Sequence, residues 1–375
     1  MTDDSGSRPL PRHPFFVWST AAIFICASLG VPALPGCEDP AVDSPRVRER
    51  SRLSVVQERP GEKRIEGIGP IHGFGKSRDT TFIHCLELVL EATGRKLDYD
   101  ELMGISGIAF RTQFNVDRWD VGNPDPLVGD SCLDLLFSAI GVEYELWVVR
   151  RDELAEVAAL RRKINESIDR GAPVLAANIM PPEDWGIITG YRPGYQWLCR
   201  SYNGGALHDD RPAKGWPTAV ILLKSRKTMP PLRKTHAESI AHAVELFEQR
   251  SRGSYAHGAS AFDFWCQNLR GASDRRYIHA NVWTYIGLMD ARAAAVRYLR
   301  SIAKEFGSHE RFILQAADRY DAEVLALREG YRYVPSEQAF RDSVPPAEMR
   351  QRQIAVLLKA KELEQQAINA LRQAK

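Results

Sequence analysis

The spacing of apolar residues predicts a folded region over 67–225 in which short helices and strands alternate. A period of 3.6 residues predicts helices over 82–92, 98–103, 131–139 and 151–169. Short segments rich in β-branched and aromatic residues predict strands over 142–149, 173–179, 186–191, 196–201 and 218–223. Because helices come first and an antiparallel run of strands follows, the expected fold class is α+β.

The pattern changes after Met229-Pro230-Pro231, where strands give way to long helices. Helical periodicity extends over 235–250, 259–269, 275–306, 309–329 and 346–375. We therefore expect an all-α domain over 235–375 to follow an α+β domain over 67–225. The last helix has an apolar period close to 3.5, so it either closes the bundle as an ordinary helix or packs as an antiparallel or coiled-coil arm.

The N-terminus carries an apolar segment of the kind that directs export. Residues 15–34 are almost entirely apolar and follow a basic stretch, which is typical of an export signal or a single membrane anchor. The segment ends in Leu34-Pro35-Gly36-Cys37. This ending resembles the lipobox of bacterial lipoproteins, in which the signal is cut before a cysteine that becomes diacylated, and the resemblance implies lipidation of Cys37.

An uncleaved anchor and a plain cleaved signal are the alternatives to a lipoprotein. All three place the rest of the chain outside the cytoplasm, in the cell envelope. Residues 38–66 combine several prolines with alternating Arg and Glu, which predicts a solvated, disordered linker. The expected organisation is a targeting segment over 1–37, this linker over 38–66, and then the two domains.

Composition narrows the function classes. The chain has 375 residues, of which 44% are hydrophobic and 26% charged, and such values exclude a wholly disordered, collagenous or polytopic membrane chain. The net charge is +2, so no basic excess indicates nucleic acid binding. Six cysteines are too few for a disulfide scaffold, and none has the spacing of a zinc site. We expect no metal, no cofactor and no nucleic acid partner.

Cys85 is the main candidate for chemistry. A polar loop over 72–81 runs into the predicted helix over 82–92, which places Cys85 in the first turn of that helix. A thiol there feels the helix dipole and the unpaired backbone N–H groups, which favour the thiolate and stabilise an oxyanion. We therefore expect the pKa of Cys85 to be lowered. The alternative is a structural cysteine, which is equally common at such a position.

Three further stretches, 99–111, 184–191 and 253–265, accompany the His84-Cys85 helix. Together they resemble the papain-like fold of the C39-peptidase-like proteins, a group that includes the N-terminal domain of butirosin biosynthesis protein H. The resemblance covers roughly residues 67–305. It implies a papain-like fold and acyl chemistry, with a cysteine nucleophile, a histidine base, and an Asn or Asp that orients the histidine.

The chain departs from this pattern at two positions. Papain-like enzymes have a histidine at the start of the strand that here begins with Asp184-Trp185, and a glutamine shortly before the cysteine, where this chain has Asp79. Asn203 matches the orienting residue, while a base would come from His84, His72 or His208. The candidate catalytic residues are Cys85, His84 and Asn203, and the candidate binding residues are Asp79, Arg111, Asp184 and Trp185.

Two function classes follow. The first is an exported, membrane-attached cysteine hydrolase or acyltransferase that acts on an amide or thioester through Cys85 and a relocated base. The second is a non-catalytic relative that binds a peptide or acyl group, because the usual histidine and glutamine are missing. In both classes the partners are a peptide or acyl substrate and, through the N-terminal segment, a membrane. Whether the chain is an enzyme stays open.

Overall fold

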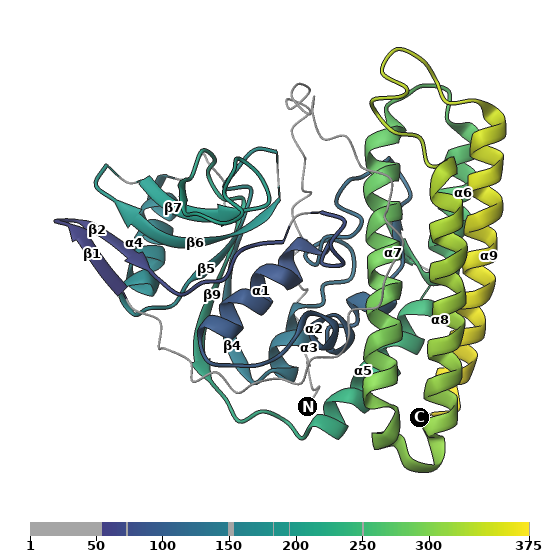
Figure 1. Ribbon diagram of the computed structural model, residues 1–375, viewed down its shortest axis with the longest axis horizontal. Coiled ribbons are helices and arrows are strands. Elements are labelled where there is room, and N and C mark those ends of the chain that lie inside the picture. The colour runs from purple at the N-terminus through teal and green to yellow at the C-terminus, as the bar shows by residue number, and fades with distance from the viewer. Residues whose placement is uncertain are drawn as a thin grey trace, which may run out of the picture. The chain divides into compact units, whose positions relative to one another are not determined.

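The structure of the protein is a computed structural model that describes residues 55–72, 74–148, 154–182, 184–194, 196–249 and 251–374 (Figure 1). The α+β class is confirmed, since an antiparallel sheet is followed by a helical C-terminal region. All described residues fall within one unit of mutually packed elements. The predicted targeting segment over 1–37, with Cys37, and the predicted linker up to residue 54 lie outside the described residues.

Within the described residues the main sheet has eight strands, which pair antiparallel throughout. The predicted strands are all present, and the strand over 196–201 has its predicted bounds. The order across the sheet is β1 (Val55–Arg59), β2 (Glu62–Ile65), β6 (Trp185–Arg192), β5 (Val174–Ala177), β9 (Ala219–Arg226) and β4 (Val142–Val148), with β7 (Gln196–Ser201) paired to β6 and β8 (Arg211–Pro212) paired to β7.

Strand β6 organises this sheet, because β5 and β2 pair with successive parts of one edge and β7 pairs with the other. At Gly190 of β6 a Cβ would lie 2.4 Å from the carbonyl oxygen of Lys63. Only glycine therefore lets β2 approach this closely. The pairing on both edges fixes where β6 begins, and with it the position of Asp184, the residue immediately before the strand.

The prediction of a disordered linker over 38–66 is wrong from Val55 on, where β1 and β2 form a hairpin on the sheet. Its charges suggested a solvated chain, but Glu62 is 2% exposed and pairs with Arg192 of β6 at 2.6 Å. Lys63 pairs with Asp169 at 2.7 Å. These partners lie 130 and 106 residues away in the sequence, so local composition does not reveal them.

Three helices lie between the sheet and the long C-terminal helices (Figure 1): α1 (Thr81–Ala92), α2 (Tyr99–Ile105) and α3 (Leu133–Ala139). Helix α1 packs on β5 and β6, and α2 packs on α7 (Tyr277–Ile302). Helix α4 (Leu154–Asp169) packs on β2, β5 and β6. Asp98 accepts the N–H of Glu101 at 2.9 Å and so caps α2.

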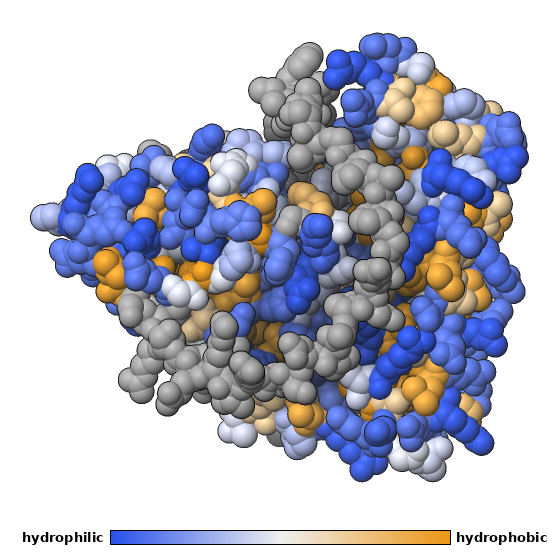
Figure 2. Space-filling view, viewed as in Figure 1, coloured by the Kyte–Doolittle hydropathy of each residue, from blue (hydrophilic) through white to orange (hydrophobic). Residues whose placement is uncertain are grey.

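The C-terminal region contains the predicted long helices. Besides α7 they are α5 (Leu232–Glu248), α6 (Gly258–Gly271), α8 (Glu310–Gly330) and α9 (Ala347–Arg372), with 3₁₀ turns η2 (Ala303–His309) and η3 (Tyr331–Tyr333). Helix α9 packs on α5, α6 and α8, so it closes the bundle as an ordinary helix. On the face shown in Figure 2, hydrophilic side chains over the helical region alternate with hydrophobic ones. No helix in the described part of the chain is long and apolar enough to cross a membrane.

A second sheet joins the two predicted domains, and the sequence did not reveal it. Strand β3 (Gln113–Asn115), which follows the 3₁₀ turn η1 (Ile108–Phe110), pairs with β11 (Tyr255–His257), and β11 pairs with β10 (Ser251–Arg252). Arg292 of α7 adds a buried link by donating to the carbonyl oxygen of Ala109 at 2.8 Å. The proposed boundary near 226–234 therefore separates two regions that share strand pairs and buried hydrogen bonds.

Candidate functional site

Cys85 lies on the buried side of α1 and is 0% exposed. Because α1 begins at Thr81, Cys85 is its fifth residue and belongs to the second turn, where backbone N–H groups already have acceptors within the helix. Burial, and to a lesser degree the carboxylate of Asp184, raises the pKa of Cys85 well above its usual value. The expectation of a lowered pKa at Cys85 is therefore wrong, because burial disfavours the thiolate and outweighs the helix dipole.

His84 is occupied by other partners. Its Nδ1 lies 2.7 Å from Oε2 of Glu87, and its Nε2 accepts the backbone N–H of His72 at 3.0 Å. An accepting Nε2 places the proton of a neutral ring on Nδ1. The ring is 1% exposed and stacks on that of His72 at 5.1 Å between centroids. His84 thus ties the loop to α1, and it has no nitrogen left to activate Cys85.

The remaining predicted catalytic and oxyanion positions also have local structural partners. Asn203 donates its side-chain amide to the carbonyl oxygen of Pro182 at 3.0 Å. Asp79 accepts the backbone N–H of Gly75 at 2.7 Å, and burial raises the pKa of its carboxyl. The structure therefore does not bring Cys85, His84 and Asn203 together as a triad.

A different set of side chains meets where α1 and β6 begin. Thr81, the first residue of α1, donates its hydroxyl to Oδ1 of Asp184 at 2.5 Å. The backbone N–H of Trp185 donates to the same oxygen at 2.7 Å. We refer to the hydroxyl and carboxyl as the Thr81–Asp184 pair. It links the first turn of a helix to the start of a central strand.

The Thr81–Asp184 pair is supported by a chain of hydrogen bonds that leads to Arg111. The indole N–H of Trp185 donates to Oδ2 of Asp125 at 2.9 Å. Arg111 donates to the backbone carbonyl oxygens of Pro124 and Asp125, each at 2.9 Å, and so holds the loop that carries Asp125. Three of the four predicted binding residues, Arg111, Asp184 and Trp185, are thus connected in one network.

Asp184 has an unusual proton affinity for a carboxyl group. Burial is the main cause that raises the pKa of Asp184 to about 7, and the carboxylate of Asp125 adds to the rise, while the bonds from Thr81 and Trp185 oppose it. A carboxyl with this pKa exchanges its proton near neutral pH, as a general acid or base must. Perturbed carboxyl groups of this kind are more frequent at functional sites than elsewhere.

The helical region supplies a second carboxyl group to the start of α1. Oδ2 of Asp290, on α7, accepts the backbone N–H of Asp79 at 3.2 Å and that of Thr80 at 3.3 Å, and it also accepts the hydroxyl of Tyr99. Burial, aided by the nearby Asp79, raises the pKa of Asp290 to about 6. Asp290 therefore holds the two residues that precede α1, whereas Asp184 binds only the hydroxyl of Thr81 at this end of the helix.

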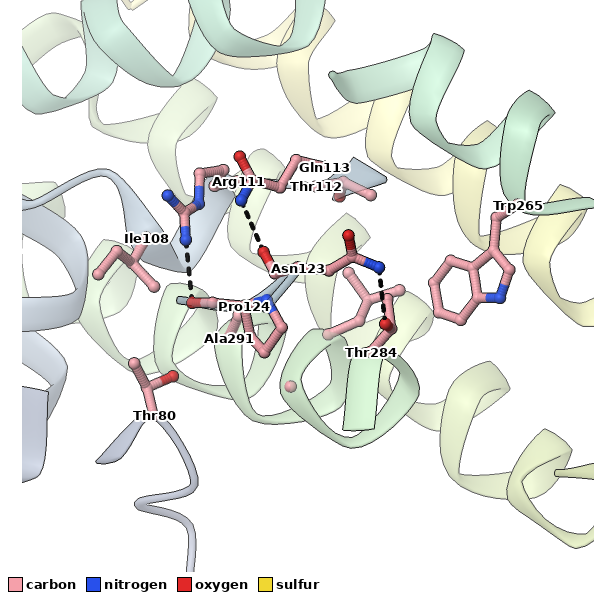
Figure 3. Close-up of a pocket in the computed structure, with 12 residues that line it drawn as sticks. Thr80, Ile108, Arg111, Thr112, Gln113, Asn123, Pro124, Trp265, Thr284 and Ala291 are labelled. Atoms are coloured by element: carbon pink, nitrogen blue, oxygen red, sulfur yellow. Dashed lines mark hydrogen bonds between the residues drawn. The ribbon is translucent and has the colours of Figure 1, made fainter. Parts of the chain in front are cut away.

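A small cavity lies next to this end of α1 (Figure 3). Its volume of about 30 Å³ suffices for one or two water molecules. At its edge Arg111 donates to the carbonyl oxygen of Pro124, Gln113 donates to that of Asn123, and the side-chain amide of Asn123 donates to the hydroxyl of Thr284 (Figure 3). The lining residues are Thr80, Ile108, Arg111, Thr112, Gln113, Asn123, Pro124, Trp265, Thr284, Gly287, Leu288 and Ala291. The hydrogen bonds of Arg111 at the edge of the cavity hold the loop of Asp125, and the cavity is too small to hold a substrate.

Comparison of the sequence with models of known protein families and with curated proteins finds no match. The described residues contain no group of three or more His, Cys, Asp or Glu side chains arranged to hold a metal ion.

Sequence reasoning missed Thr81, Asp125 and Asp290. A hydroxyl residue at the end of a polar loop, directly before an apolar helix, is a signal that could have identified Thr81. No local signal marks Asp125 or Asp290, because they reach the site from a distant loop and from α7.

Proposed function

We propose that the chain is an exported protein of papain-like fold that binds a peptide or acyl group where α1, β6 and β7 meet, without cysteine chemistry. The complete burial of Cys85 carries this proposal. A cysteine enzyme needs an accessible thiolate beside a base, whereas the pKa of Cys85 is raised by burial and the nitrogens of His84 are both engaged. The second function class from the sequence is the one we retain.

The placement of the elements supports a papain-like arrangement. Helix α1 packs against β5 and β6, and its N-terminal end lies at the start of β6. Strand β7 runs antiparallel beside β6, so that Ser201, shortly before Asn203, lies opposite Gly186. Asp184 and Asn203 stand at the two positions where the resemblance places the base and its orienting residue.

The side chains at this junction suit an apolar ligand with one polar group. The rings of Phe82 and Trp185 lie edge to face at 4.9 Å and are buried, whereas the half-buried ring of Phe74 packs on that of Tyr202 at 5.0 Å. When protonated, Asp184 can donate from Oδ2 while its Oδ1 accepts the hydroxyl of Thr81. An acyl chain or an apolar peptide side chain would contact Phe74, while its carbonyl group would accept from Asp184.

Export and membrane attachment belong to the same proposal and rest on residues 15–37. The mature protein should begin at a lipidated Cys37 and fractionate with membranes. The intact mass of the mature protein tests this prediction. A mass that retains residues 1–36, or normal processing of a Cys37→Ala protein, would contradict lipidation.

Binding is tested with two fluorescent probes, an octanoylated peptide and the same peptide without the acyl group, titrated against the full chain. We expect the wild-type protein to bind at least one probe and Cys85→Ala to bind it with a Kd within twofold. Iodoacetamide at neutral pH should leave binding unchanged. Loss of binding in Cys85→Ala, or no binding of either probe by the folded protein, would overturn the proposal.

A further inference from the structure

Strand β4 forms an open edge of the main sheet. One side of the strand pairs with β9, and no strand lies on the other side among the residues that the structure describes. The strand has seven residues, and the outward N–H and C=O groups of such an edge are a template for a further strand. Leu146 is 38% exposed and Val148 is 44% exposed on one face of β4. The edge thus presents unpaired backbone groups together with apolar side chains.

The other described sheet edges carry features that oppose strand addition. Four of the five residues of β1 are exposed, two of them are the charged Glu58 and Arg59, and its register is irregular after Val56. Strand β8 has two residues, one of which is Pro212, β10 also has two, and β3 has three that are buried. Shortness, proline, charge and bulges are the features by which proteins protect sheet edges. The second half of β4 has none of them.

We infer that β4 pairs antiparallel with β4 of a second copy of this chain, so that the two main sheets join across a two-fold axis at Leu146. A two-fold axis is the commonest symmetry of homo-oligomers, and it brings the same strand together in opposite directions. Leu146 then lies opposite its own counterpart, and Val148 lies opposite Tyr144 of the partner subunit. Strands β9 and β5 separate this edge from β6, so the inference goes beyond the proposed function and does not depend on it.

The charges on β4 select this register. Residues opposite each other in an antiparallel pair have side chains on the same face, so their numbers differ by an even amount. An axis at Glu145 would place two carboxylates opposite each other, and an axis at Tyr144 would place Glu143 opposite Glu145, which is destabilising. An axis at Trp147 would pair only the last three residues of the strand. The axis at Leu146 pairs five residues and separates the carboxylates.

Both faces of the joined strands suit this contact. On one face, Glu145 would lie opposite the indole of a second Trp147, whose N–H bonds to Glu145 within each chain at 2.8 Å. Lys163 and Lys224 pair with Glu145, so this carboxylate brings no unpaired charge into the contact. On the other face, Phe137 stacks on Tyr144 at 4.4 Å between ring centroids. These rings offer an apolar surface to the incoming valine.

Cysteine cross-linking of the full chain in mild detergent tests the pairing. Opposite residues of an antiparallel pair have Cα atoms about 4.5–5.5 Å apart, which suits a disulfide bond. We expect Leu146→Cys to form a disulfide between two copies on oxidation with copper phenanthroline, located by mass spectrometry of the linked peptides. Val148→Cys is the matched control. It is similarly exposed, but its counterpart lies roughly 14 Å away in this register, so its yield should be at least about tenfold lower.

Opposite charges at residue 146 test the register without a disulfide. Leu146→Lys and Leu146→Glu each place like charges opposite each other, so each protein alone should sediment as a monomer. An equal mixture of the two should sediment as a dimer, because a lysine then faces a glutamate. Residue 146 is exposed in the monomer, and thermal melting checks that both variants are folded. A mixture that stays monomeric would overturn the inference.

Three other results would also overturn it: no disulfide at residue 146 in Leu146→Cys, an equal yield in Val148→Cys, or a monomeric wild-type chain at the concentration of the cross-linking. Hydrogen exchange of Val142–Val148 identifies other occupants of the edge. Protection should rise with protein concentration if a second copy covers β4, whereas constant protection would mean that the chain covers its own edge and would contradict the inference. None of these results changes the binding of the octanoylated peptide, which tests the proposed function separately.

Discussion

Two groups of buried carboxyls lie on either side of the contact between the sheet and the helical region, and they differ in what neutralises them. In the bundle, Arg292, Glu323 and Glu364 are each 0% exposed, and the guanidinium of Arg292 lies 2.6 Å from Glu364 and 3.4 Å from Glu323. At the start of α1, Asp184 is paired with a neutral hydroxyl and a backbone N–H. The carboxyl groups of the first set are paired with a cation, whereas Asp184 in the second set has no cation beside it and can exchange a proton.

The difference separates a buried cluster held by a cation from a carboxyl group that titrates near neutral pH. Arg292 supplies one positive charge to two carboxyl groups, and burial raises the pKa of Glu323 well above its usual value, so Glu323 stays protonated. The cluster is then neutral and joins α7, α8 and α9 to Ala109. Asp184 has a pKa of about 7 through burial and lies beside the buried hydroxyl of Thr81. Asp184 therefore titrates near neutral pH, whereas the cluster around Arg292 keeps its charge state there.

The largest expected effect is a loss of stability when the cation of the bundle cluster is removed. Arg292→Met leaves the carboxylate of Glu364 buried without its cation, and we expect the free energy of unfolding to fall by about 3–5 kcal/mol. Urea denaturation followed by circular dichroism measures it. Arg297→Met is the control, since Arg297 pairs with Asp100 at 2.6 Å but is 43% exposed, and its loss should cost less than about 1 kcal/mol. Equal losses of unfolding free energy in the two variants would contradict a stabilising role of the buried Arg292 cluster.

The next prediction concerns Asp184 and the way in which it makes stability depend on pH. Because burial raises the folded pKa of Asp184 to about 7, the native state holds a proton that the unfolded chain releases above a pH of about 4. The contribution of Asp184 to the free energy of unfolding therefore falls as pH rises from about 4 to about 7, by at most about 1.4 kcal/mol per pH unit. Above a pH of about 7 this contribution is constant. Asp184→Asn should lose this dependence and be more stable than wild type at pH 8.

Urea denaturation of both proteins between pH 4 and pH 8 checks the Asp184 prediction. The difference in unfolding free energy between Asp184→Asn and wild type should grow in favour of the variant across this range. A constant difference would show that the carboxyl of Asp184 has an ordinary proton affinity.

A smaller effect concerns His236, which connects the two regions. Burial alone would lower the pKa of His236. Hydrogen bonds to Glu101 at 2.9 Å and to Glu305 at 2.7 Å outweigh burial, so the pKa of His236 is raised. Its stabilising contribution is then fully present below pH 6.5 and is lost as pH rises through the raised folded value. We expect His236→Gln to cost on the order of 1 kcal/mol at pH 6 and less at pH 9.

The control for His236 is His279→Gln. His279 lies 2.9 Å from Glu337, but both side chains are more than half exposed, at 53% and 55%, so this substitution should leave stability unchanged within about 0.5 kcal/mol. A cost for His236→Gln that does not vary between pH 6 and pH 9 would contradict the assignment of a protonated ring.

The smallest effect on stability is expected from cleavage between the two regions. Residues 227–229 are exposed, so limited proteolysis should cut there before it cuts within β4 to β9. The fragments should stay together, because β3 pairs with β11 and Arg292 bonds to Ala109 across the cut. Size-exclusion chromatography of the cleaved protein checks this, and separate elution of two fragments would show independent domains.

The sequence predicted the elements whose signals are local. The helices over 82–92 and 98–103 and the strand over 196–201 appear within two residues of their predicted bounds. The third helix begins at Leu133, two residues later than expected. The hairpin of β1 and β2 and the β3–β11 pair were missed because their charged or short segments gain partners only from distant parts of the chain.

The sequence predicted part of the network at the start of α1. Asp184, Trp185 and Arg111 do lie together, since the position at the start of a strand is a local property. Cys85 was expected in an exposed first turn, whereas α1 begins at Thr81 and Cys85 lies buried in its second turn. The true start depends on Asp290, which accepts the N–H of Thr80 from 210 residues away in the sequence, and no local pattern contains that information.

The central claim is that Cys85 belongs to the core and that the junction of α1, β6 and β7 binds its ligand without cysteine chemistry. One experiment tests it directly: treat the native full chain with iodoacetamide to completion at pH 7.5, map the modified peptides, and titrate the octanoylated peptide. We predict an unmodified Cys85 and a Kd within twofold of that of the untreated protein. Alkylated Cys85 together with loss of binding would contradict the account.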